Sequence, residues 1–136
     1  MAAKHNILAL DVGDRRVGVA LADSQIKIAV PYGYLEQGDD IIQQITELMI
    51  DHSIDIVVVG YPRNQSGEAT KQTESVEQFA KQLAEIDIDA ELVFQDESLT
   101  SVEAERRLGR VKDKGEIDAE AASIILQDFL EQNYAD

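Results

Sequence analysis

The chain has 136 residues, a formal net charge of −15 and no cysteine. This length predicts one domain, residues 1–136, with one core, and the lack of cysteine excludes a disulfide framework and a thiolate metal site. No apolar run approaches the length of a membrane span, and no signal peptide is recognisable at the N-terminus. We therefore expect a soluble cytoplasmic protein that makes no membrane contact.

The few cations are concentrated in three places. Eight of the twelve are Arg15, Arg16, Arg63, Arg106, Arg107, Arg110, Lys112 and Lys114. Because exposed charges are screened over about 8 Å at physiological salt, a local group of cations outweighs distant acids, so a polyanionic partner stays possible. Basic residues at a helix C-terminus are the simpler explanation for Arg106 and Arg107, and explain Lys112 and Lys114 less well.

Two apolar runs around a short turn open the chain. Residues 5–11 and 16–22 are predicted strands of an antiparallel hairpin. Asp11 ends the first run, and taken alone it is more simply a turn cap than a catalytic acid. Alternating apolar residues between Ser24 and Leu35 predict a third strand, with Pro31 favouring an edge or an interruption.

Helices and strands alternate in the rest of the chain. Helical periodicity is present at 39–52, in a segment that ends near Glu85, at 100–109 and at 117–132, and strand-like runs occur at 54–60 and 90–96. This order predicts an α/β fold with a five-stranded mixed sheet, antiparallel in its first three strands and then parallel, with helices on both faces. Sites in such sheets lie beyond the carboxyl ends of the parallel strands.

Three acids occupy comparable positions in this scheme. Asp11 ends the first strand, Glu97 follows the strand at 90–96, and Asp118 enters the last helix on its apolar side. If Asp118 faced outward, a first-turn acid favoured by the helix dipole would explain it equally well. Carboxylates that meet repel one another unless a cation intervenes, and oxygen ligands without Cys or paired His indicate Mg²⁺ or Mn²⁺. Such ions can activate a water in phosphodiester hydrolysis.

His5 and His52 are predicted surface residues.

Four motifs in a fixed order resemble the YqgF family, the Holliday-junction-resolvase-like proteins of bacteria that are also described as pre-16S rRNA nucleases. They are DVG at 11–13 with RVGVA at 16–20, VVGYPRN at 58–64 with Gly67, DESLTS at 96–101 with EAE at 103–105, and ID at 117–118 with AA at 121–122 and IIL at 124–126. The resemblance spans nearly the whole chain.

The resemblance implies an RNase H-like fold and a metal-dependent nuclease that processes the 5′ end of pre-16S rRNA in ribosome biogenesis. It implies that the catalytic residues and metal ligands, for Mg²⁺ or Mn²⁺, are Asp11, Glu97 and Asp118. The loop with Arg63 and Asn64 is implied to lie near the same site. The residues that we expect to bind substrate phosphates are Arg15, Arg16, Arg63, Asn64, Arg110, Lys112 and Lys114.

The chain departs from the family at three places. Ser98 stands where the family usually has Arg, and serine cannot replace a charged guanidinium fork. Asp14 adds a negative charge beside Asp11, and the basic stretch before the last helix is shorter than in many members. None of these changes affects the three acids.

Several alternatives stay open. A Holliday-junction or other DNA resolvase, and a non-catalytic nucleic-acid- or ribosome-associated module, fit the same residues. The nucleotide-binding lobe of an actin-like kinase also has Asp-x-Gly after a strand, but those enzymes close two lobes over the nucleotide and 136 residues supply one. RNA and branched DNA are not distinguished, nor are one and two metal ions, nor a monomer and a weak dimer.

Overall fold

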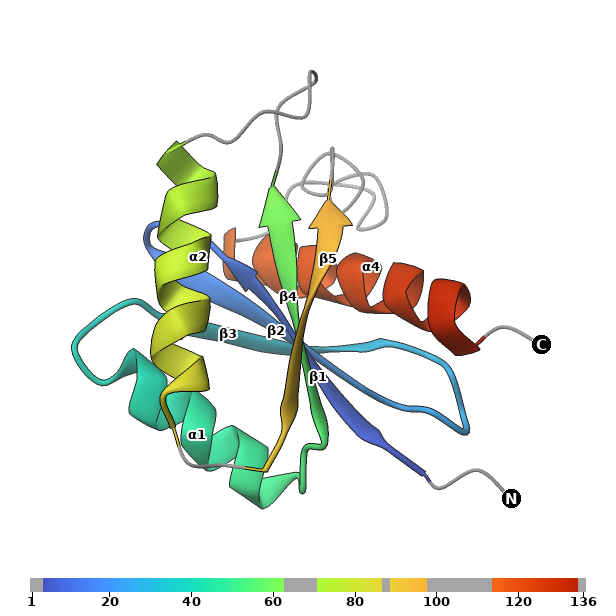
Figure 1. Cartoon of the computed structure of the whole chain (residues 1–136). Coiled ribbons are helices and arrows are strands. Elements are labelled where there is room, and N and C mark those ends of the chain that lie inside the picture. The colour runs from blue at the N-terminus through green and yellow to red at the C-terminus, as the bar shows by residue number, and fades with distance from the viewer. Residues whose placement is uncertain (1–3, 63–70, 87–88, 98–113, 135–136) are drawn as a thin grey trace.

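The computed structural model describes residues 4–62, 71–86, 89–97 and 114–134. Five strands form one mixed sheet in the order β3-β2-β1-β4-β5 (Figure 1). They are β1 (Asn6–Val12), β2 (Arg16–Asp23), β3 (Val30–Glu36), β4 (Ile56–Pro62) and β5 (Glu91–Glu97). The first three strands pair antiparallel, whereas β4 is parallel to β1 and to β5. The predicted mixed sheet is confirmed.

Helices cover both faces of this sheet. The described helices are α1 (Ile41–Asp51), α2 (Lys71–Ala84) and α4 (Lys114–Tyr134). Figure 1 shows α1 and α2 on one face and α4 crossing the other. Within the described ranges, no helix is long and apolar enough to span a membrane.

Strand β1 lies in the middle of both cores. Leu8 and Leu10 pack with the side chains of α1 and α2, and Ile7 and Ala9 pack with those of α4. All four are fully buried. Because successive strand residues point to opposite faces, a strand covered on both sides needs apolar residues without alternation, as the sequence of this segment predicted.

Several predicted boundaries are corrected. The third strand starts at Val30, because the carboxylate of Asp23 accepts hydrogen bonds from the backbone N–H groups of Gln25 and Ile26 and folds the preceding residues into a turn. β3 is an edge strand, and its register with β2 is irregular near Pro31, as expected. The last helix begins at Lys114, earlier than predicted. The helix predicted at 100–109 lies outside the described residues.

Candidate metal and nucleic-acid site

Asp11 lies at the carboxyl end of β1 on the face that α4 covers. Ile7 and Ala9 belong to the core on that face, and strand alternation places Asp11 on the same side. Asp11 is partly buried. Its register partner on β2 is Gly18. Asp11 therefore stands at the rim of the core beside a residue that has no side chain.

The glycine at position 18 lets α4 approach the sheet. A Cβ atom added at Gly18 would overlap the backbone carbonyl of Asp118. Since Gly18 pairs with Asp11, the first turns of α4 lie against the end of the β1–β2 hairpin, as Figure 1 also shows. The fold thus brings Asp11 and Asp118 to the same end of the β1–β2 hairpin, although 107 positions separate them in the sequence.

Asp118 is bound by an arginine of the same hairpin. Nε of Arg16 donates a hydrogen bond to Oδ2 of Asp118 at 2.7 Å, and both side chains are 25% exposed. Arg16 is the first residue of β2, so this ion pair joins the start of β2 to the start of α4. Ala122 and Ile125, one and two turns further along α4, are buried, and this bond directs the side chain of Asp118 toward the hairpin. A charge-assisted bond of this length orients both groups.

Glu97 reaches the same edge of the sheet through its backbone. It is the last residue of β5 and the register partner of Pro62 on β4. The carboxyl ends of parallel strands meet at one edge, so β1, β4 and β5 all point here. The side chain of Glu97 lies outside the described residues, and its approach to Asp11 stays a prediction.

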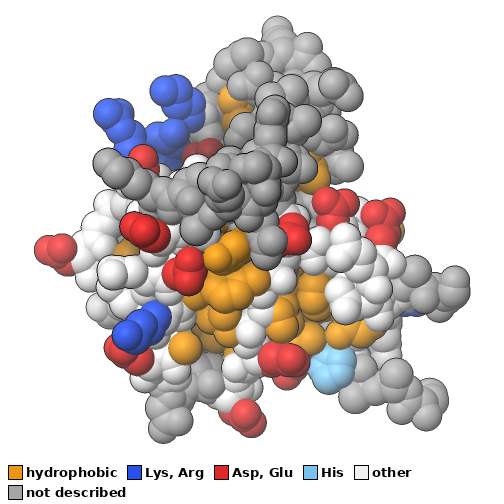
Figure 2. Space-filling model, turned by 45° about the horizontal axis from the view of Figure 1, so that its top comes forward, with side chains coloured by type: hydrophobic (Ala, Val, Ile, Leu, Met, Phe, Trp, Pro, Cys, Tyr) orange, Lys and Arg blue, Asp and Glu red, His pale blue; other side chains and the backbone are white. Residues whose placement is uncertain are grey.

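The predicted phosphate-binding residues are described only in part. Arg15 and Lys114 are exposed, whereas Arg16 is engaged with Asp118. Figure 2 shows Lys and Arg side chains at the upper left of the drawn face and again at its lower left, with Asp and Glu side chains scattered around a hydrophobic patch in the middle. The other predicted contacts, Arg63, Asn64, Arg110 and Lys112, lie outside the described residues.

The carboxylate groups at this end of the sheet are chemically suited to binding a hard divalent cation. Asp11 and Asp118 supply carboxylate oxygens, the ligands that Mg²⁺ and Mn²⁺ prefer. Glu97 is the candidate for the third carboxylate. Among the described side chains, no three His, Asp or Glu residues lie close enough together to hold a metal ion. A metal at this place therefore depends on Glu97 or another residue beyond the described set.

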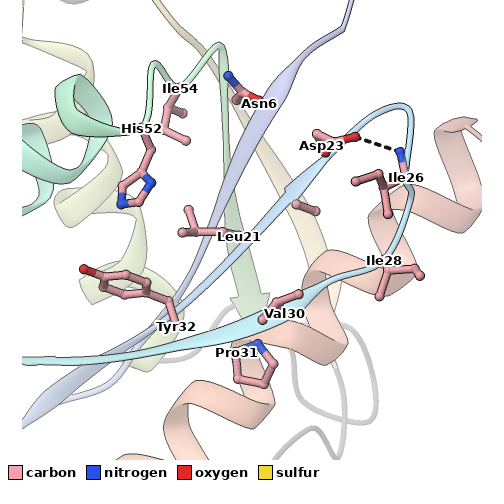
Figure 3. A pocket seen from close by; sticks show the side chains of 11 residues that line it. Asn6, Leu21, Asp23, Ile26, Ile28, Val30, Pro31, Tyr32, His52 and Ile54 are labelled. Carbon is pink, nitrogen blue, oxygen red and sulfur yellow. Dashed lines mark hydrogen bonds between the residues drawn. The ribbon is translucent and has the colours of Figure 1, made fainter.

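A large apolar cavity lies at the other end of the β1–β2 pair. It has a volume of about 510 Å³, and Asn6 and Asp23, which pair at that end of the hairpin, help to line it (Figure 3). Ile26, Ile28, Val30 and Tyr32 add exposed apolar side chains. His52, predicted at the surface, is instead half-buried here, with its ring 5.6 Å from that of Tyr32. The cavity is separate from the acids.

Two residues at this end of the sheet, Gly18 and Gln95, are not among the predicted site residues. Gly18 is part of the RVGVA motif, but its contact with Asp118 depends on packing between distant segments, which the motif does not reveal. Gln95 was read only as part of a strand, yet it is 8% exposed and its register partner is Gly60. Because four of the seven residues of β5 (ELVFQDE) are polar, the sequence contains no signal that distinguishes Gln95 from its neighbours.

Known proteins resemble this chain over most of its length. A family model described as "Holliday junction resolvase", RuvX, matches residues 5–132. A protein of Chloroflexus aurantiacus named "Putative pre-16S rRNA nuclease" is 42% identical over 132 residues, covering 92% of this chain and 86% of that protein. A protein of the same name from a Synechocystis strain is 39% identical, covering 96% and 90%.

Solved structures show the same fold at low sequence identity. The RuvC of T. thermophilus in complex with a Holliday junction matches with a TM-score of 0.55 and 11% identity, covering 93% of this chain and 94% of that one. The Fowlpox virus resolvase, also in complex with Holliday junction DNA, matches with a TM-score of 0.59 and 9% identity, covering 93% and 97%. The sheet order and the helices on both faces are thus those of the RNase H-like resolvases. By its sequence match over residues 5–132, this chain belongs to the RuvX family.

Proposed function

We propose that this chain is a cytoplasmic, metal-dependent nuclease that hydrolyses phosphodiester bonds in structured RNA and acts on the 5′ region of pre-16S rRNA. The observation that carries the proposal is that Gly18, the register partner of Asp11, lies against the backbone carbonyl of Asp118 at the carboxyl edge of the sheet. The names of the relatives support RNA as the substrate. Substrate cleavage at this edge also agrees with where open α/β sheets bind ligands.

In this proposal the acids hold the metal and the cations hold the substrate. Asp11, Glu97 and Asp118 bind Mg²⁺ or Mn²⁺, which supplies an activated water and stabilises charge on the phosphate. Arg16 holds the carboxylate of Asp118 in its orientation toward the hairpin. Arg15, Lys114, Arg63, Asn64, Arg110 and Lys112 contact substrate phosphates, and such contacts add salt-dependent affinity without reading sequence.

The proposal is tested by the Asp11→Asn variant. The amide keeps the shape of the side chain but loses the charge that a divalent cation needs, so Mg²⁺-dependent cleavage of a pre-16S rRNA fragment should fall by at least about a hundredfold, or about 2.7 kcal/mol. The matched control is Asp39→Asn, which changes an exposed acid before α1 and should keep full activity. Unchanged cleavage by rigorously purified Asp11→Asn protein would refute the proposal.

One observation favours a second candidate, a nucleic-acid-binding module without turnover. The ion pair with Arg16 already neutralises Asp118 at 2.7 Å, which leaves less charge for a metal. The two functions differ in a simple measurement. A module without turnover binds RNA and four-way DNA junctions equally well with EDTA or Mn²⁺ and releases no cleaved ends, whereas the nuclease releases them only with the metal. Cleaved junction DNA with intact RNA would identify a DNA resolvase instead.

A further inference from the structure

Gln95 is a buried amide whose side chain has no hydrogen-bond partner among the described residues. It is 8% exposed, and it follows the exposed Phe94 on β5. Buried amides in folded proteins are nearly always hydrogen-bonded, since an unpaired one loses its bonds to water and gains nothing in return. A buried amide of this kind indicates a bound water or a ligand.

Gln95 faces the same side of the sheet as Asp11. Val93, two residues earlier on β5, packs against the core beneath α4, and alternation places Gln95 on that face too. Gln95 pairs with Gly60 of β4. Leu10 pairs with Val59, so the next residues on these two strands are Asp11 and Gly60. One row across the sheet therefore contains Gly18, Asp11, Gly60 and Gln95.

The row leaves room between the carboxylate and the amide. Neighbouring strands lie about 4.8 Å apart, so the Cα atoms of Asp11 and Gln95, two strands apart, are separated by about 10 Å. Gly60 lies between them and contributes no side chain. If the side chains of Asp11 and Gln95 both extend over the glycine, they span most of the distance between the two Cα atoms. The gap that is left between the carboxylate and the amide suits one water molecule with a polar partner on each side.

We infer that Gln95 is a positioning residue of the acid site, an inference that rests on the proposed nuclease function. Its amide N–H donates to a water held over Gly60, and that water donates to the carboxylate of Asp11. The amide thus fixes the direction in which Asp11 presents its oxygens. Residues that orient metal ligands in this way change metal affinity when they are replaced, typically by about 10- to 100-fold.

The test is the Gln95→Met variant, which keeps the length of the side chain and removes the amide. Mn²⁺ binding, measured by electron paramagnetic resonance without substrate, should weaken by about tenfold. The melting temperature should stay close to that of the wild type, because the described residues make no direct hydrogen bond to this amide that the substitution would break. At saturating Mn²⁺ the variant should show a lower kcat with an unchanged KM for RNA.

A matched control separates this role from a structural one. Gln127 of α4 is a partly buried glutamine whose amide binds the backbone N–H of Ala29 and the carbonyl of Lys27. Gln127→Met should lower the melting temperature and leave Mn²⁺ affinity unchanged. Gln95→His, which keeps an N–H donor, should restore most of the Mn²⁺ affinity lost in Gln95→Met.

The outcomes distinguish failure of this inference from failure of the proposed function. If Asp11→Asn abolishes Mn²⁺ binding while Gln95→Met leaves it unchanged, Gln95 has no positioning role and the proposed site stands. If Asp11→Asn leaves Mn²⁺ binding intact, the proposed metal site itself is refuted, and the inference with it. A loss of melting temperature in Gln95→Met with normal Mn²⁺ affinity would make Gln95 a structural residue only.

Discussion

The two ends of the β1–β2 hairpin differ in chemistry. At one end Arg16 binds Asp118 at the start of α4, and Asp11, Arg16 and Asp118 are all partly buried. At the other end Asn6 and Asp23 border a cavity of about 510 Å³ lined mostly by apolar side chains. A larger cavity is the usual first choice for an active site. Here the proposed hydrolytic chemistry is instead at the charged end.

The difference between the two ends of the hairpin follows from the direction of the parallel strands. All three parallel strands, β1, β4 and β5, point their carboxyl ends at the acid site. Groups from segments far apart in the sequence lie close together there, because the loops that follow the parallel strands all begin at this end of the sheet. The apolar cavity instead lies by the turn after β2 and the start of β3, where no parallel strand ends.

The largest expected effect comes from closing the space under α4. In Gly18→Ala the new Cβ would overlap the carbonyl of Asp118, and the backbone of α4 must shift. We expect the free energy of unfolding to fall by about 1–3 kcal/mol, the usual cost of overpacking, and nuclease activity to fall with it. Urea denaturation measures the first and RNA cleavage the second.

Gly33→Ala is the matched control for this change. A Cβ at Gly33 meets nothing within 4 Å, so this variant should be as stable as the wild type or slightly more stable. Equal stability of the Gly18→Ala and wild-type proteins would show that α4 does not pack on Gly18 as described.

A smaller effect is expected from the ion pair. Arg16→Ala removes a charge-assisted hydrogen bond between two partly buried groups and should lower the free energy of unfolding by about 1–2 kcal/mol. In a double-mutant cycle with Asp118→Asn, the two changes should be clearly non-additive. Arg15→Ala, at the exposed neighbouring position, should change stability by less than about 0.5 kcal/mol. Additive effects of Arg16→Ala and Asp118→Asn would contradict the pair.

Substrate electrostatics should give a weaker signal. If Arg15 contacts a phosphate, Arg15→Ala should lower the slope of log affinity for RNA against log salt by about one. Lys81→Ala, on the exposed face of α2, is the control and should leave the slope unchanged. Binding of labelled RNA, followed by fluorescence anisotropy at several salt concentrations, measures both. Identical slopes for the two variants would remove Arg15 from the RNA contacts.

The smallest effect is expected at the apolar cavity. Ile28 is 61% exposed and Val30 56%, so Ile28→Ser and Val30→Thr remove little buried surface. We expect each variant to stay within about 0.5 kcal/mol of the wild type in unfolding and to cleave RNA at the same rate. A large loss of cleavage in either variant would place part of the active site at the apolar end and overturn the comparison.

Much of the fold was predictable because it depends on local patterns. The unbroken apolar runs of β1 and β4 predicted strands buried on both faces, and the order of elements predicted the mixed sheet. The start of α4 was predicted late, since Lys114, Gly115 and Glu116 carry no apolar periodicity. Gly115 is nevertheless buried, and a Cβ there would overlap the ring of Tyr34, so tertiary packing extends this helix.

The sequence by itself determined which groups are present: acids after strands, no cysteine, and apolar residues with the periods of strands and helices. Tertiary structure alone decided which of them meet. The hydrogen bond between Arg16 and Asp118 joins residues 102 positions apart, and the row that places Gln95 near Asp11 depends on the register of three strands. Local propensity acts over a few residues, whereas these contacts follow from packing elements against one another, which no short pattern encodes.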